Sequence, residues 1–166
     1  MAADRDWGIG KGNALPWPKL RGDLRHFKRI TSTASEGRKN AIVMGRKTWE
    51  SKEVDRRPLP NRINVVVSRS EQVLPPGVIA ARTLDEALAV PDAETIFIVG
   101  GADLLNDALA HPDLRYIYLT RVDGSFECDV KMPDLDAAGF VKTDWEGELR
   151  AEEYEIRYRI ERLRRP

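Results

Sequence analysis

One acidic side chain stands among apolar and aromatic residues near the start of the chain. The segment from Leu15 to Phe27 reads LPWPKLRGDLRHF, and Asp23 is its acid. If a helix begins near Leu20, then Asp23, Leu24 and Phe27 share one face, because residues three and four apart line up on a helix. A carboxylate in such surroundings is costly without a partner. The pattern therefore predicts a site for a cationic or proton-donating ligand.

Two glycine turns that follow apolar runs could bind phosphate groups. They are Gly45-Arg46-Lys47-Thr48 and Gly100-Gly101-Ala102. A helix that begins after such a turn presents free backbone N–H groups and its positive dipole end, which suit a pyrophosphate. Neither turn matches the G-x-G-x-x-G fingerprint, and either alone could be a plain turn. Together they could hold the two ends of one dinucleotide. Arg46, Lys47 and Arg69 then favour NADPH over NADH, since its extra phosphate needs extra positive charge.

The strands and helices that must position these residues alternate along the chain. We expect helices at 22–31, at 84–90 after a cap at Thr83, and at 102–109, and strands at 40–44, 63–68, 95–99, 114–121 and 154–160. The run 95–99 is apolar throughout, as in a strand buried on both faces. The run 154–160 alternates with period two, as in a strand with one solvated face. The order predicts an α/β fold: a single domain over 1–166 with a mostly parallel central sheet, an antiparallel C-terminal edge and helices on both faces.

Bulk properties exclude several classes of protein. A chain of 166 residues is long enough for one domain with a sizeable core. Its 27 basic and 27 acidic side chains give no general attraction to nucleic acid or to an anionic membrane. No apolar run approaches the roughly 20 residues of a membrane helix. The single cysteine, Cys128, excludes an internal disulfide, and two histidines make a zinc or iron site improbable. We expect a cytoplasmic protein with no metal, nucleic-acid or membrane partner.

Seven segments, in order along nearly the whole chain, resemble the dihydrofolate reductase family. Each is weak alone, but seven at near-family spacing are specific. The segments are Gly8-Ile9-Gly10, Leu15-Pro16-Trp17, the run from Asp23 to Phe27, the run from Val43 to Ser51, the run from Arg57 to Arg62, Ile98-Val99-Gly100-Gly101, and Tyr118-Leu119-Thr120.

The resemblance implies an activity and its setting. The family reduces 7,8-dihydrofolate to 5,6,7,8-tetrahydrofolate by direct hydride transfer from NADPH, with carboxylate-assisted protonation of N5. Such an enzyme is an oxidoreductase of one-carbon metabolism, binds antifolates such as methotrexate, and is usually a monomer when it stands alone. No metal and no covalent intermediate is needed.

The resemblance also implies roles on the substrate side. Asp23 matches the family's active-site carboxylate, Trp17 the residue that holds an ordered water, and Thr120 the threonine bonded to the carboxylate. Arg62 matches the arginine that pairs with the substrate's α-carboxylate, which suits its two-pronged donor geometry. The resemblance also places Leu15 among the catalytic residues. The other implied substrate contacts are Ala2, Leu20, Leu24, Phe27, Lys28, Leu59 and Val99.

On the cofactor side, the glycine pair matches one whose peptide bond is typically cis. Ile9 and Leu15 match a mobile loop that closes over nicotinamide, and Asp129 matches an acid in a second loop that supports the closed form. The implied cofactor residues are Ala2, Ile9, Gly45, Arg46, Lys47, Thr48, Ser68, Arg69, Arg82, Val99, Gly100, Gly101, Ala102, Asp103 and Leu104.

Several positions depart from the family's pattern, and two alternatives stay open. The first strand is short, so we expect unpaired backbone groups near Ala2. Leu105 stands where many members have a tyrosine, Asp103 where many have a base, and Lys52 where many have an apolar residue. One alternative is a reductase of the same fold that acts on a pyrimidine intermediate of riboflavin synthesis. The other is an inactive protein that binds NADPH or folate.

Overall fold

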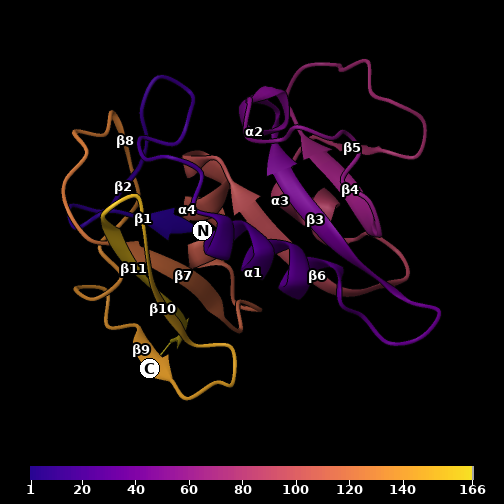
Figure 1. Ribbon diagram of the computed structural model, residues 1–166. Helices are drawn as coiled ribbons and strands as arrows, with labels where there is room; N and C mark the ends of the chain where they lie inside the picture. Colours follow the sequence, from indigo (N-terminus) through magenta and orange to yellow (C-terminus); the bar gives the residue numbers. More distant parts are fainter. Residues whose placement is uncertain (166) are drawn as a thin grey trace. The chain divides into compact units, whose positions relative to one another are not determined.

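The computed structural model describes residues 1–165, and their contacts divide the chain into two compact units (Figure 1). The first unit comprises Met1–Arg25 and Leu109–Pro166, and the second comprises His26–Ala108. Helix α1 (Arg21–Ser32) runs from the first unit into the second, and it confirms the helix predicted at 22–31.

The second unit contains a four-stranded parallel sheet. Its strand order is β5 (Ile79–Ala81), β4 (Arg62–Val67), β3 (Lys39–Gly45) and β6 (Ala93–Gly100). The β-branched runs of β3 and β4 favour strands because branched side chains pack well on a pleated surface. Helices α2 (Arg46–Glu50) and α3 (Leu84–Leu88) and most of α4 (Ala102–Ala110) belong to this unit.

Strand β3 forms the centre of this sheet, and its residues 41–44 are fully buried. Successive side chains of a strand point to opposite faces. Val43 accordingly packs with Leu84 and Leu104 of α3 and α4, whereas Ile42 and Met44 pack in a second cluster with Trp49 of α2. The sheet is thus covered on both faces, as predicted. Thr83 caps α3 as predicted, because its side chain accepts a hydrogen bond from the Glu86 N–H.

One expectation about burial is wrong. The apolar run 95–99 was expected in a strand buried on both faces, but four of these five residues are only half-buried and Thr95 is exposed. The reason is position: β6 lies at the end of the strand order, with β3 as its neighbour in that sheet. An apolar run cannot by itself distinguish a central strand from an edge strand.

The first unit is mainly antiparallel. Strand β7 (Ile117–Val122) lies between β1 (Ala2–Ala3), which is parallel to it, and β11 (Ile156–Arg164), which is antiparallel. Strands β9 (Val141–Thr143) and β10 (Leu149–Glu153) also pair with β11, and β2 (Gly8–Gly10) pairs with β8 (Val130–Lys131). The mixed α/β class is confirmed, with parallel pairing concentrated in one unit and antiparallel pairing in the other.

The short first strand is nevertheless paired. The Met1 nitrogen donates to the Tyr118 carbonyl at 2.9 Å, and the Thr120 N–H donates to the Met1 carbonyl at 2.8 Å. These bonds continue the parallel register of Ala2 with Thr120. Backbone groups at the start of the chain therefore find partners on β7.

The C-terminal strand begins later than its alternating pattern predicts. Tyr154 and Glu155 form a two-residue turn with φ values of 53° and 61°, and it joins Glu153 of β10 to Ile156 of β11. Two positive φ angles in a two-residue hairpin loop are typical of a type I′ turn, which favours Asn and Gly. Neither residue type is present, so the turn and β10 leave little trace in the sequence.

The strained turn predicts a stabilising substitution. Glu155→Gly should raise the free energy of unfolding by about 0.5–1 kcal/mol, because glycine adopts positive φ without the Cβ clash of other residues. Urea denaturation measures the change. Glu152→Gly, within β10, is the control and should destabilise the protein. Destabilisation by both substitutions would contradict the turn.

Candidate active site

Asp23 and Thr120 are brought together in the first unit. Asp23 lies in the first turn of α1 and is half-buried, whereas Thr120 lies on β7 and is 2% exposed. The Thr120 hydroxyl donates to Oδ1 of Asp23 at 2.5 Å, although the two residues are 97 positions apart. A distance of 2.5 Å is at the short end of the range for a hydrogen bond between two oxygen atoms. Within residues 1–165 this bond engages Oδ1 of Asp23 and not Oδ2, and the Met1 ammonium interacts electrostatically with the same carboxyl group.

The segment that leads into α1 packs in an apolar cluster of this unit. Trp17 and Leu20 are 4% and 2% exposed and pack with Tyr158 and Ile160. The Trp17 ring meets the Phe126 ring edge-on, with the centroids 5.4 Å apart. Leu15 packs at the margin of the same cluster. The deep burial of Leu20 makes it a core residue first, with little surface for a ligand.

The predicted apolar face of α1 is only partly covered. Phe27 is half-buried, Leu24 is 38% exposed, and Lys28 is exposed. An exposed leucine beside a half-buried acid and ring leaves apolar surface that a ligand can cover.

A loop near the start of the chain is fastened at two points. The Asp129 carboxylate accepts a hydrogen bond from the Gly12 N–H at 2.9 Å, and the Asp129 N–H donates to the Gly10 carbonyl. Asp4 accepts N–H bonds from Asp6, Gly8 and Phe126. Burial raises the pKa of Asp4, but these bonds outweigh it and lower the pKa below its usual value. The family motifs indicated Asp129 as an acid that supports this loop, but they gave no sign of Asp4, since acids near turns are common.

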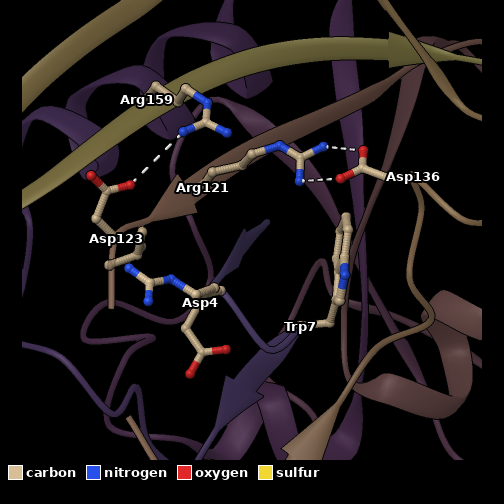
Figure 2. Close-up of a pocket in the computed structure, with 8 residues that line it drawn as sticks. Asp4, Trp7, Arg121, Asp123, Asp136 and Arg159 are labelled. Atoms are coloured by element: carbon tan, nitrogen blue, oxygen red, sulfur yellow. Dashed lines mark hydrogen bonds and ion pairs between the residues drawn. The ribbon is translucent and has the colours of Figure 1, made fainter. Parts of the chain in front are cut away.

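A charged pocket of about 270 Å³ in the first unit has a structural explanation. Figure 2 shows Arg121 pointing toward Asp136, which it contacts through two N–H groups, and its Cζ lies 4.9 Å from the Trp7 ring centroid. Arg121 and Arg159 both donate to Glu161 at 2.8 Å. Burial lowers the pKa of Arg121, but its bonds to Asp136 and Glu161 raise it overall. These charges neutralise one another and tie β7 to β11.

In the second unit, the predicted phosphate-binding residues gather along one edge of the sheet. Gly45, Val67 and Ala81 are register partners at the carboxyl ends of β3, β4 and β5. The carboxyl ends of parallel strands lie at the same edge. The residues that follow these ends are Arg46, Lys47 and Thr48 after β3, Ser68 and Arg69 after β4, and Arg82 after β5. The four basic side chains are exposed, and the edge therefore carries concentrated positive charge.

The two glycine turns meet, as their places on adjacent strands predict. A Cβ on Gly45 would lie 3.4 Å from the Gly101 nitrogen, and a Cβ on Gly100 would lie 3.5 Å from the Thr48 hydroxyl oxygen. Gly100 has φ +134° and the Gly100-Gly101 peptide bond is cis, as the resemblance implies. Gly45 precedes α2 and has no side chain with which to cap the first N–H groups of that helix.

One residue in α4 needs a different role from the one that the resemblance implies. Leu104 was expected at the cofactor, but its side chain is 6% exposed and packs in the core with Val43 and Val65. Only its backbone N–H, at the start of the helix, is suited to a phosphate. Leu105 is equally buried, whereas Asp103 is exposed.

Arg62 is a buried arginine with a partly used guanidinium group. It is 8% exposed, donates through Nε to the Pro60 carbonyl at 3.0 Å and through Nη1 to the Thr31 hydroxyl at 2.8 Å. Its Cζ lies 5.9 Å from the Phe27 ring centroid, and burial lowers its pKa. The remaining donors suit a planar carboxylate.

Two supporting residues were missed from the sequence. Thr31 lies four positions after Phe27 on α1, bonds to the Phe27 carbonyl, and accepts from Arg62. The side chain of Asn64 on β4 accepts a hydrogen bond from the Leu59 N–H and donates one to the Leu59 carbonyl. These bonds fix the loop that carries Leu59 and leads into Arg62. Helical spacing could have suggested Thr31, but nothing local identifies Asn64.

Comparisons with known proteins agree with these features. A profile of the dihydrofolate reductase family matches residues 1–165. The dihydrofolate reductase of Mus musculus is 36% identical over 173 residues, covering 97% of this chain and 92% of that protein. A bifunctional dihydrofolate reductase-thymidylate synthase of Glycine max is 41% identical over 169 residues, covering 95% of this chain. The solved structure of Schistosoma mansoni dihydrofolate reductase has a TM-score of 0.85 and 31% identity, and the match covers 100% of this chain and 96% of that one.

The structure is a mixed α/β fold with a basic edge on its parallel sheet, and it matches the fold of a solved dihydrofolate reductase. The chain belongs to the dihydrofolate reductase family, whose members are NADPH-dependent oxidoreductases. The predicted family, enzyme class and cofactor are thereby confirmed. The chain spans 31% of the length of its Glycine max relative, which carries a second activity in its name. None of the helices within residues 1–165 has the length and apolar character needed to cross a membrane.

The histidine on α1 predicts a pH dependence of stability. His26 is 8% exposed, and burial together with the Arg29 charge lowers its pKa to about 4. Because the unfolded chain binds this proton near pH 6.5 and the folded chain does not, stability should fall as the pH drops from 6.5 to about 4. The loss is at most about 1.4 kcal/mol per pH unit.

His26→Gln should flatten this part of the curve of unfolding free energy against pH. Urea denaturation across the window measures it in both proteins, and His111→Gln controls for the loss of a histidine as such. Parallel curves for the wild type and His26→Gln would contradict a neutral, buried His26.

Proposed function

We propose that this chain reduces 7,8-dihydrofolate to 5,6,7,8-tetrahydrofolate with NADPH. The observation that carries the proposal is the half-buried Asp23 carboxylate held by the buried Thr120 hydroxyl, in a chain of this family. Dihydrofolate has a C6=N5 imine, which accepts hydride at C6 once N5 is protonated. An acid among apolar side chains suits the delivery of that proton.

Asp23 has two proposed tasks. Its Oδ2 would accept hydrogen bonds from the pterin's 2-amino group and N3, which orients the ring. It would also assist the transfer of a solvent proton to N5 through a water held near Trp17. Thr120 keeps the carboxylate in one orientation throughout, because its hydroxyl donates to Oδ1. Hydride comes from the nicotinamide of NADPH.

The remaining proposed substrate contacts follow the surfaces of each unit. In the first unit, Ala2, Leu15 and Leu24 would supply apolar contacts to the substrate, whereas Leu20 packs in the core. In the second, Phe27, Leu59 and Val99 supply them, Arg62 binds the α-carboxylate with its remaining donors, and the exposed Lys28 adds positive charge for the glutamate. Thr31 and Asn64 hold Arg62 and Leu59 in place.

The proposed cofactor site runs along the carboxyl edge of the parallel sheet. Ser68 and Arg69 would hold the 2′-phosphate, and Arg82 would lie near the adenosine. The pyrophosphate would be held by Arg46, Lys47, Thr48 and the N–H groups after Gly45 and Gly101. Ile9, Val99, Gly100 and Ala102 would contact the nicotinamide end, with Leu104 contributing its backbone. We further propose that 1–166 acts as a single reductase domain, as a monomer in the cytoplasm, and that antifolates such as methotrexate compete with substrate.

Removal of the acid tests the proposal. Asp23→Asn should lower kcat by about a hundredfold or more at neutral pH, since general acid catalysis contributes about 10²–10⁴-fold. The Kd of NADPH should not change. The assay is NADPH oxidation with dihydrofolate, with and without methotrexate.

Unchanged turnover of Asp23→Asn would overturn the role of Asp23. A wild-type protein that binds NADPH but does not oxidise it with dihydrofolate would instead point to another heterocycle or to a binding protein. A substrate panel that includes a ribose-phosphate pyrimidine separates those two.

The sheet edge predicts a specificity change. Arg69→Ala should raise the KM for NADPH about tenfold and leave that for NADH nearly unchanged, because a lost charge-assisted hydrogen bond costs about 1.5 kcal/mol. Arg38→Ala is the control, since Arg38 precedes β3 at the opposite end of the strand and pairs with Glu94. An equal rise for both cofactors would argue against a 2′-phosphate contact.

A further inference from the structure

The helix that carries Asp23 begins without a cap of its own. The Leu24 N–H donates to the Leu20 carbonyl at 3.0 Å, so Leu20 occupies the position before the first helical residue. Ser, Thr, Asp or Asn usually stands there, because its side chain accepts a hydrogen bond from the first turn. A leucine side chain has no atom that can accept such a hydrogen bond, and Leu20 is buried in the core.

Glu153 takes the place of the missing cap. Its Oε2 accepts the Arg21 N–H and its Oε1 accepts the Gly22 N–H, both at 2.8 Å. A carboxylate at the N-terminus of a helix also interacts favourably with the helix dipole. The cap thus comes from β10, more than 130 positions along the chain.

Tyr158 fixes this carboxylate from the neighbouring strand. Its hydroxyl donates to Oε1 of Glu153 at 2.5 Å. In the hairpin, Glu153 pairs with Ile156 and Ala151 pairs with Tyr158, so Glu153 and Tyr158 are diagonal neighbours on one face. Tyr158 is 3% exposed and packs with Leu20, so its hydroxyl has little freedom to move.

Gly22 fits this arrangement because it has no side chain. A Cβ at this position would overlap the Tyr158 hydroxyl oxygen, and it would lie 3.1 Å from Oε1 of Glu153 and 3.4 Å from Cζ of Tyr158. Glycine inside a helix is unfavourable relative to alanine. The close approach of Tyr158 explains why glycine stands here.

The charges in this group favour one protonation state. Burial, the hydrogen bond and charge of Glu153, and the charge of Asp23 raise the pKa of Tyr158 to about 12. The Tyr158 hydroxyl bond and the Gly22 and Arg21 N–H groups lower the pKa of Glu153. Tyr158 therefore stays a donor and Glu153 an acceptor across the physiological range.

We propose that Gly22, Glu153 and Tyr158 form a clamp that fixes the first turn of α1 and thereby positions Asp23 against Thr120. These three are positioning residues, and Asp23 is the group that reaches the substrate. The inference rests on the proposed function. A misplacement of about 1 Å can lower a rate about a hundredfold, and Asp23 follows Gly22 directly in the clamped turn.

The test is a double-substitution cycle. Gly22→Ala should lower kcat with dihydrofolate at least about tenfold, with the KM for NADPH unchanged, because its Cβ displaces the Tyr158 hydroxyl and the turn with it. Tyr158→Phe should cost only about two- to threefold, since Leu20 packing remains. The double variant should regain most of the activity that Gly22→Ala loses, because without the hydroxyl the nearest ring atom is 3.4 Å away. A double variant no better than Gly22→Ala overturns the clamp.

The carboxylate is tested with Glu153→Gln, whose single amide oxygen cannot accept both N–H groups. It should lower kcat several-fold and leave the KM for NADPH unchanged. The matched controls are Glu152→Gln and Tyr154→Phe, which alter exposed neighbours on the same hairpin and should keep wild-type kcat. Equal effects of Glu153→Gln and Glu152→Gln would overturn the role of Glu153.

Thermal unfolding of the same four proteins in the Gly22 and Tyr158 cycle separates this inference from the proposed function. If the wild type does not reduce dihydrofolate, the proposed function fails, yet recovery of Tm in the double variant still supports the clamp. If the wild type is active but kcat and Tm are additive in the cycle, the clamp fails while the proposed function stands.

Discussion

The hydrogen bond from Thr120 to Asp23 is the interaction on which the proposed chemistry of the first unit depends. Thr120 lies on the strand between β1 and β11, and its backbone is bonded to Met1, so its hydroxyl has a fixed position. Asp23 lies at the start of α1, where helices commonly fray. A single hydrogen bond to a fraying turn would orient an acid poorly. The Glu153 carboxylate removes this weakness, because it satisfies two N–H groups of the same turn. The same carboxylate therefore stabilises the helix terminus and holds the turn that carries Asp23.

The second unit obeys a different constraint, that of parallel strands. Such strands place all their carboxyl ends at one edge, and the residues that follow them share that edge without any further device. Four exposed basic side chains and two glycine turns meet there because β5, β4, β3 and β6 are neighbours in register. The glycines matter for their lack of side chains, because a Cβ on Gly45 would lie only 3.4 Å from the Gly101 nitrogen. A site of this kind needs few specific contacts between side chains, which is why its sequence signature is short.

That difference explains what the sequence could and could not predict. Residues after strands, such as Thr48 and Arg69, were identifiable because local pattern determines where a strand ends. Asp23 and Arg62 were identifiable because each lies within a short family motif.

Glu153, Thr31 and Asn64 were not identifiable, because each acts through a contact between elements. An acid, a threonine or an asparagine in isolation has no distinctive pattern. The Tyr154-Glu155 turn was missed for a related reason: its positive φ angles are imposed by the hairpin and not by its residue types. The exposure of β6 depends on strand order, which an apolar run does not encode.

A crystal structure of the protein with NADP⁺ and folate tests the account most directly. It should show Oδ2 of Asp23 within hydrogen-bond distance of the pterin's 2-amino group or N3, with Thr120 still bonded to Oδ1 and Glu153 still capping α1. It should also show the 2′-phosphate against Ser68 and Arg69. A pterin ring bound away from Asp23, or an Asp23 carboxylate turned away from Thr120, would contradict the account.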